Sequence, residues 1–251
     1  MTTTDSARRA GSAAYGVNIA PVAALMADPA RAAMLAALIA GPALSAGELG
    51  QLAGVSPATA SAHLGRLLDG GLVTVTRQGR HHYYTLAGHE VADAFEAIAA
   101  ISPARPIRSL RQSRQAELLA QARTCYDHLA GRAGVALLDA LLSRGMLTGD
   151  GTGAGAAYQV TSSGADVLAG FGVDVAKVAQ ARRRFAGACL DWTQRRPHLN
   201  GALGAALTSR LTELGWIQRG PSPRSIRITE PGRDGLAATF GCSLANGQAP
   251  D

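Results

Sequence analysis

The spacing of hydrophobic and polar positions changes twice within the first third of the chain. Leu49 and Leu52 lie on one face of an expected helix that ends near Gly54. A second helical pattern follows, with Leu64 and Leu67 on its apolar face. The two patterns predict a pair of short helices joined by a sharp turn.

The second expected helix has polar residues on the face away from the core. Ser56 is a favourable N-cap, and Pro57 suits the first helical position. Small and hydroxyl-bearing residues on the outer face allow the backbone to approach a partner closely. These features are expected of a helix that enters the major groove of double-stranded DNA.

Two strand-like runs come next, Thr74–Thr76 and His82–Thr85, with a turn expected at Gln78-Gly79. Basic residues gather at the tip of this hairpin, where they can meet phosphates. Two helices followed by a basic hairpin predict a winged helix-turn-helix. We expect DNA contacts from Ser56, Thr59, Ala60, Ser61, His63, Arg66, Arg77, Arg80 and His81.

The same residues carry a resemblance to a known family. Asp28-Pro-Ala-Arg31, Ser61-Ala-His-Leu64 and Arg77-Gln-Gly-Arg80 resemble the opening, the recognition helix and the wing of the ArsR/SmtB repressors. The resemblance covers residues 17–101. It implies a winged-helix homodimer that blocks transcription until an effector binds.

Two positions where that family often binds metal depart from its pattern. The segment Glu48–Leu52 has no cysteine, and the residues after the wing offer only a loose likeness to a zinc-binding set. That set would comprise His89, Glu90, Asp93 and Glu96. The departures argue against classical arsenic or zinc sensing.

Composition agrees with a polyanionic partner. The 251 residues carry a formal net charge of +6, and Lys177 is the one lysine among 24 basic residues. Arginine favours bidentate contacts to guanine and phosphate. Aromatic residues make up only 4% of the chain, which argues against a single-strand binder that stacks bases.

The expected location is the cytoplasm, with no membrane association. The chain has no apolar run of about 18 residues, as a membrane span requires, and its first residues are polar. Three widely spaced cysteines do not form a disulfide framework. We expect residues 1–16 and 246–251 to be disordered tails.

The second half of the chain repeats features of the first. Glycine–apolar pairs begin at residues 71, 145 and 215, and each precedes a short strand that ends beside a threonine. The fold class is therefore mainly α with small β-hairpins (α+β). We expect a winged helix-turn-helix at 17–101 and two degenerate winged-helix-like units at 107–245, the latter forming a sensor domain.

Both later units contain Cys-x-Asp followed by an aromatic ring, at Cys125 and at Cys189. Residues 107–130 are expected to be a helix rich in arginine, which would make Cys125 a neighbour of His128. This region is the expected effector site. Its candidate residues are Cys125, Tyr126, Asp127, His128, Cys189, Asp191, Trp192, Arg195 and His198.

Three interpretations of that site stay open. The cysteines, histidines and aspartates include ligands for a soft or borderline metal. Alternatively, an organic anion binds a pocket formed by Tyr126, His128, Trp192, Arg195, Arg196 and Trp216. In the third interpretation the cysteines are small buried hydrophobic residues, Asp127 and Asp191 cap helices or pair with arginine, and Trp192 belongs to the core.

Together these observations predict a sequence-specific DNA-binding regulator, a homodimeric repressor that reads an inverted repeat and responds to a metal or small organic effector. A winged helix used for protein contacts is one alternative. A second is an enzyme with Cys125 as nucleophile and His128 as base. That case lacks an oxyanion hole and an orienting third group, so we expect no enzymatic activity.

Overall fold

The computed structural model describes residues 16–41, 43–79, 81–103, 106–149 and 155–244. The tails expected at 1–16 and 246–251 therefore lie outside the described residues, except Gly16. The chain forms two compact units, the first comprising residues 1–38 and 42–88, and the second comprising residues 39–41 and 89–251. The helix after the wing thus belongs to the second unit, whereas we expected it in the first.

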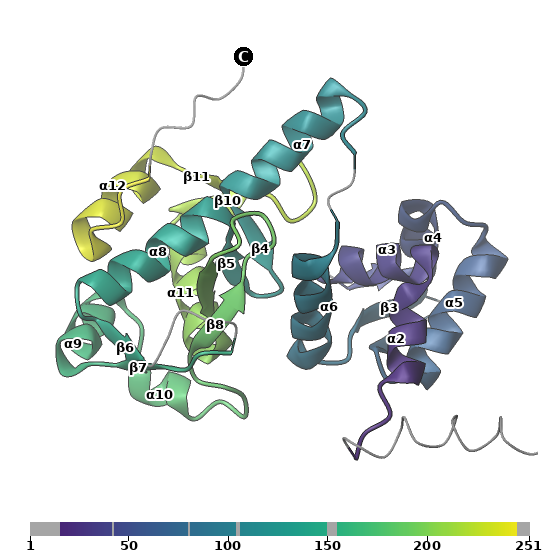
Figure 1. Ribbon diagram of the computed structural model, residues 1–251, viewed down its shortest axis with the longest axis horizontal. Helices are drawn as coiled ribbons and strands as arrows, with labels where there is room; N and C mark the ends of the chain where they lie inside the picture. The colour runs from purple at the N-terminus through teal and green to yellow at the C-terminus, as the bar shows by residue number, and fades with distance from the viewer. Residues whose placement is uncertain (1–15, 42, 80, 104–105, 150–154, 245–251) are drawn as a thin grey trace, which may run out of the picture. The chain divides into compact units, whose positions relative to one another are not determined.

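The first unit has the element order of a winged helix (Figure 1). Its antiparallel sheet has the strand order β1-β3-β2. The elements are α2 (Ala20–Ala27), α3 (Pro29–Leu38), β1 (Leu44–Ser45), α4 (Ala46–Ala53), α5 (Pro57–Asp69), β2 (Val73–Gln78) and β3 (His81–Leu86).

Local capping explains where α4 and α5 begin and end. Ser45 and Glu48 form a reciprocal capping box at the start of α4. Gly54 ends α4 with a φ of 68°, a left-handed conformation that favours glycine. Ser56 then accepts a hydrogen bond from the Thr59 N–H at the start of α5.

The two helices pack through small residues. Leu49, Leu64 and Leu67 are fully buried, as the sequence pattern predicted. Leu52 is 53% exposed, contrary to the expected apolar face. The core contact of α4 is made instead by Gly50, where an added Cβ would lie 3.1 Å from that of Ala60.

The Asp28-Pro-Ala-Arg31 motif joins α2 to α3. The Asp28 carboxylate accepts hydrogen bonds of 3.0 Å from the backbone N–H groups of Ala30 and Arg31. The buried Arg31 side chain donates back to the carbonyls of Ala24 and Leu25 at the end of α2. One short motif therefore pairs the backbone N–H groups at the start of α3 and the backbone carbonyls at the end of α2, which lack partners within their helices.

The second unit combines helices with four two-stranded antiparallel hairpins. It begins with α6 (His89–Ile101) and α7 (Leu110–Gln121). Its first repeat contains β4 (Arg123–Cys125), β5 (His128–Ala130), α8 (Gly131–Ser143), β6 (Leu147–Gly149), β7 (Tyr158–Val160) and α9 (Ser162–Phe171). After α10 (Val175–Ala179), the second repeat contains β8 (Gly187–Leu190), β9 (Pro197–Asn200), α11 (Gly201–Glu213), β10 (Ile217–Arg219), β11 (Ile226–Ile228) and α12 (Glu230–Phe240).

The two repeats use the same contacts. The Thr161 hydroxyl donates to the Gly145 carbonyl at 2.6 Å, and the Thr229 hydroxyl donates to the Gly215 carbonyl at 2.9 Å. Both threonines also cap the helix that follows. The structure therefore confirms the mixed fold of helices and small hairpins.

The repeats share one core and exchange contacts. Helix α8 packs on β9 of the other repeat, α11 packs on β5, and β5 contacts β9. Buried leucines from both repeats form a continuous cluster that includes Leu138, Leu141, Leu168, Leu203, Leu207, Leu211 and Leu236.

The helix expected over residues 107–130 is wrong beyond Gln121. The chain there forms the β4–β5 hairpin, with Cys125 paired to His128 across a turn in which Tyr126 has a φ of 59°. The equivalent β8–β9 hairpin pairs Cys189 with His198. The segment forms a hairpin despite its helix propensity, because the paired strands pack against α8 and α11.

No single helix among the described residues is long and apolar enough to cross a membrane. Helices α2 and α3 reach that length only when they are counted together, and they are bent by 90° relative to each other.

Candidate functional site

The outer face of α5 is the first candidate site. Thr59, Ser61 and Arg66 are exposed on it, as expected for a helix that contacts DNA. The Ser56 and Thr59 hydroxyls are 2.9 Å apart, and the Ser61 hydroxyl donates to the Pro57 carbonyl at 3.0 Å. The oxygen of Ser61 keeps a lone pair for an incoming donor.

Ala60 does not belong to this face, which corrects the expected contact set. Its side chain is fully buried against Gly50 of α4. The alanine is small because the helices approach closely at that point, so it packs the core and cannot reach a base.

His63 lies at the border between the outer face and the core. Its side chain is 14% exposed. Its Nδ1 atom lies 3.4 Å from Arg31 Nη1 and 3.7 Å from Asp28 Oδ1. Hydrogen bonds from the Arg31 backbone keep the pKa of Asp28 below its ordinary value. The motif that joins α2 to α3 therefore also holds the imidazole.

The wing places basic residues at its exposed end. Arg77 and His82 are paired across β2 and β3, and Gln78 is paired with His81. The side chains of Arg77, His81 and His82 are exposed. Arg80, which was expected to contact DNA, lies outside the described residues.

A second candidate site is built by the two hairpins of the C-terminal unit. One ligand-capable atom from each of Cys125, His128, Cys189 and His198 lies within 4.8 Å of the others. All four side chains are buried. The two sulfur atoms are 3.9 Å apart, and the imidazole rings stack with centroids 5.1 Å apart.

A carboxylate lies behind each histidine. Asp127 Oδ1 is 3.3 Å from His128 Nδ1, and Asp191 Oδ2 is 3.7 Å from His198 Nδ1. Both Nε2 atoms are buried and have no hydrogen-bond partner among the described residues, and the same holds for His198 Nδ1. Each Cys-x-Asp segment therefore supplies a thiol and a carboxylate to the same cluster.

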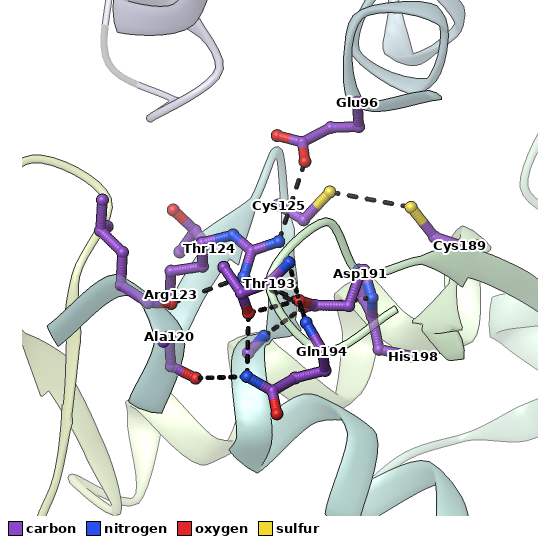
Figure 2. Close-up of polar contacts among 12 residues, drawn as sticks. Glu96, Ala120, Arg123, Thr124, Cys125, Cys189, Asp191, Thr193, Gln194 and His198 are labelled. Carbon is purple, nitrogen blue, oxygen red and sulfur yellow. Dashed lines mark hydrogen bonds and ion pairs between the residues drawn. The ribbon is translucent and has the colours of Figure 1, made fainter. Parts of the chain in front are cut away.

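Asp191 is occupied by structural contacts as well (Figure 2). Its carboxylate pairs with Arg123 at 3.0 Å and accepts the Gly131 N–H at 2.6 Å. It also accepts hydrogen bonds from Thr193 and from the Gln194 N–H. These bonds hold the β8–β9 turn against the start of α8.

Arg123 connects this network to α6. The guanidinium is fully buried and lies 3.9 Å from Glu96 Oε2 (Figure 2). It also lies over the Trp192 ring, 4.7 Å from the ring centroid. Arg224 also pairs with Glu96. The sequence analysis expected Arg123 within the arginine-rich helix over residues 107–130. It missed the pairing with Glu96, because the partners are far apart along the chain.

Burial and charge shift the pKa values in the cluster. Contact with Cys189 and burial raise the pKa of Cys125 well above its ordinary value. Burial and the neighbouring His128 lower the pKa of His198. Burial disfavours the charged form of His128, but Cys125 and Asp127 raise the pKa of this histidine to about 9. Burial also disfavours the charged form of Asp191. Arg123 and the Thr193 hydroxyl lower the pKa of Asp191 to about 2.

The residues suggested for an organic-anion pocket do not converge. Arg195 is exposed, Arg196 pairs with Asp139, and Trp216 packs on Phe171. A small cavity of about 160 Å³ does adjoin the cluster. Its lining comprises His89, Asp93, Tyr126, Asp127, His128, Arg183, Arg184, Asn200 and Gly201.

Comparison with known proteins identifies the chain. A helix-turn-helix domain family matches residues 26–76. YdfF of Bacillus subtilis (strain 168), an uncharacterised HTH-type transcriptional regulator, is 42% identical over 216 residues, which are 86% of this chain and 94% of the relative. The chain belongs to the ArsR type of HTH transcriptional regulators. Because the match spans 216 residues, the ArsR-type regulator shares much of its C-terminal unit with YdfF.

Solved structures match the N-terminal part of the regulator. The repressor BigR from Xylella fastidiosa is 28% identical, covering 42% of this chain and 100% of its own, with a TM-score of 0.33. A homodimeric winged helix-turn-helix domain from Mycobacterium bovis, a possible ArsR-family regulator, is 32% identical, covering 33% and 76%, with a TM-score of 0.31. The cadmium sensor CMTR from Mycobacterium tuberculosis is 30% identical, covering 37% and 99%, with a TM-score of 0.29.

Proposed function

We propose that this DNA-binding regulator is a homodimeric repressor that binds an inverted repeat and releases it in response to an effector. The exposed face of α5 beside the basic wing carries the proposal, because it offers hydroxyl and guanidinium groups at one surface. The proposed contacts are Ser56, Thr59, Ser61, His63, Arg66, Arg77, Arg80 and His81.

Exposed apolar residues support the dimer. Val17, Ile19 and Val22 are 67%, 74% and 40% exposed near α2, and Ile98 and Ile101 are 45% and 84% exposed on α6. Burying such side chains is favourable. We propose that residues 17–101 read DNA and dimerise through these segments. A two-fold dimer would read half-sites about one helical turn apart, or a multiple of that distance.

The C-terminal residues 107–245 are proposed as the sensor. A reader of this class needs only the winged helix, and the remaining chain contains a buried cluster of reactive side chains. Helix α6 follows the wing directly and is anchored through Glu96 to Arg123 and Arg224. An effector that altered this anchorage would change the two DNA-binding states unequally, as regulation requires.

The test is fluorescence anisotropy of the purified regulator with DNA from upstream of its own gene. Scrambled DNA of the same length is the control. We expect tighter binding to the upstream DNA and a dimer in sedimentation at micromolar protein. Equal binding to both DNAs would contradict sequence-specific recognition, and a monomer bound to DNA would contradict the dimer.

Repression is tested separately in cells with a reporter fused to the same upstream DNA. We expect higher expression when the regulator is deleted. A fall in expression would indicate an activator instead.

A further inference from the structure

We propose that Cys125, His128, Cys189 and His198 bind one tetrahedral zinc-class ion that links the two C-terminal repeats. The proposal rests on the geometry of the C-terminal unit alone and does not depend on DNA binding. Each repeat contributes one thiol and one imidazole, from the paired positions of its hairpin.

The spacing of the sulfur atoms fits such an ion. With Zn–S bonds of about 2.3 Å, tetrahedral coordination places two sulfur atoms about 3.8 Å apart. The observed separation of Cys125 Sγ and Cys189 Sγ is 3.9 Å, and both cysteines are free. The four donors already lie within 4.8 Å of one another, so only small side-chain movements would complete the shell.

The donors also have the right chemistry. Two sulfurs and two imidazole nitrogens in tetrahedral geometry are typical of zinc. His128 Nε2 and both ring nitrogens of His198 are buried without a hydrogen-bond partner among the described residues, so each imidazole has a nitrogen that can coordinate an ion. An unpaired buried nitrogen is costly, and a metal ion would remove that cost.

The carboxylates complete the arrangement. A histidine that binds metal through one ring nitrogen usually donates its other N–H to an acceptor such as a carboxylate. Asp127 Oδ1 is hydrogen-bonded to His128 Nδ1 at 3.3 Å. Asp191 Oδ2 lies 3.7 Å from His198 Nδ1, beyond hydrogen-bond distance, so a small movement of this ring is needed to complete the second pair. The repeated Cys-x-Asp signature therefore encodes a ligand and the group that orients the neighbouring ligand.

Helix packing fixes the position of each imidazole. Gly204 of α11 would place an added Cβ 3.2 Å from His128 Cβ, and Gly134 of α8 would place one 3.4 Å from His198 Cβ. Each histidine thus packs on the helix of the opposite repeat. With all four positions supplied by buried protein groups, the site has no open position for a substrate and holds the repeats together.

A disulfide between Cys125 and Cys189 is the competing state. It would need the sulfurs to approach to about 2.05 Å and would leave both imidazoles without a role. The test must therefore distinguish bound metal from an oxidised pair.

The experiment uses the full-length regulator, reduced and stripped of metal, titrated with Co²⁺ and then with Zn²⁺. We expect one equivalent of Co²⁺ to give the visible bands of tetrahedral cobalt and a thiolate-to-metal absorption, which Zn²⁺ then abolishes. Both thiols lose their protons to solvent on binding, and each imidazole binds in its neutral form. Lack of such bands in the reduced protein, or an intact mass showing a Cys125–Cys189 disulfide after reduction and stripping under argon, would overturn the proposal.

Variants assign the bands to the cluster. Cys189→Ser should abolish the thiolate-to-metal absorption or reduce it by half, whereas Cys242→Ser should leave it unchanged. Cys242 is a matched control because it is buried in the core outside the cluster. Asp127→Asn should weaken Zn²⁺ affinity by about 10–100-fold, with circular dichroism as the check on folding. Unchanged spectra and affinity in both Cys189→Ser and Asp127→Asn would overturn the assignment.

Discussion

Ser61 and Arg77 represent two kinds of proposed DNA contact, one to a base and one to the backbone. Ser61→Ala should reduce discrimination between the preferred DNA and scrambled DNA by about 1–3 kcal/mol if the hydroxyl makes a good direct contact. Ser61 is exposed on α5, so the change should not affect folding. Equal weakening on both DNAs would show that Ser61 does not read a base.

Arg77→Ala should instead weaken binding to every sequence. The residue is exposed on the wing, where it can neutralise a phosphate. Losing one phosphate contact should lower the slope of log affinity against log salt by about one. Anisotropy titrations at several salt concentrations measure the slope, and an unchanged slope with altered base preference would contradict the prediction.

Ala60 illustrates how a small residue was assigned to the wrong face. From the sequence, a small residue on the reading helix is compatible with either close approach to DNA or close packing of two helices. The fully buried side chain and its contact with Gly50 decide for packing. Ala60→Leu should therefore destabilise the fold by about 1–3 kcal/mol. Ala62→Leu, exposed on the same helix, should change the free energy of unfolding by less than about 0.5 kcal/mol. Urea unfolding of the two variants makes the comparison.

At the scale of elements, the winged helix was predictable and the hairpins that carry the cluster were not. Caps at Ser56 and Gly54 and the spacing of buried leucines are local signals, and they placed α4 and α5 correctly. The strands β4 and β8 have three and four residues, too few for a periodic pattern to emerge. The sequence still identified Cys125, His128, Cys189 and His198 as candidates through the repeated Cys-x-Asp segments. Their mutual distances depend on long-range packing that local patterns do not encode.

Gly204 tests that long-range packing. Gly204→Ala would place a Cβ 2.6 Å from the Leu199 carbonyl oxygen and 3.2 Å from His128 Cβ, so α11 must move away from the hairpins. We expect destabilisation of about 1–3 kcal/mol and weaker Co²⁺ binding. Gly170→Ala in α9 has nothing within 4 Å and should be neutral or stabilising by up to about 1 kcal/mol. Similar unfolding curves for the two variants would contradict the close packing of α11 on the hairpins.

At the scale of the whole molecule, the question is whether the proposed metal also serves as the effector. The chain offers a route, since Cys125 lies two residues from Arg123, which lies beside Glu96 of α6. Helix α6 in turn follows the last strand of the wing. Any change in the β4–β5 hairpin on metal binding would thus act on the helix that continues from the DNA reader.

Thermodynamic linkage turns this into a measurable prediction. If Zn²⁺ changes the affinity of the regulator for its upstream DNA by some factor, the DNA must change the affinity for Zn²⁺ by the same factor. We expect reciprocal shifts of about 5–150-fold, the range typical of allosteric coupling. Competition with a chelator, with and without upstream DNA, measures the change in Zn²⁺ affinity. Anisotropy with and without Zn²⁺ measures the change in DNA affinity.

Cys189→Ser should abolish both shifts, while Cys242→Ser should retain both. Equal Zn²⁺ affinity with and without DNA would contradict this coupling, because a ligand that binds both states equally cannot shift the equilibrium between them. The ion would then only stabilise the C-terminal unit, and another ligand would act as the effector.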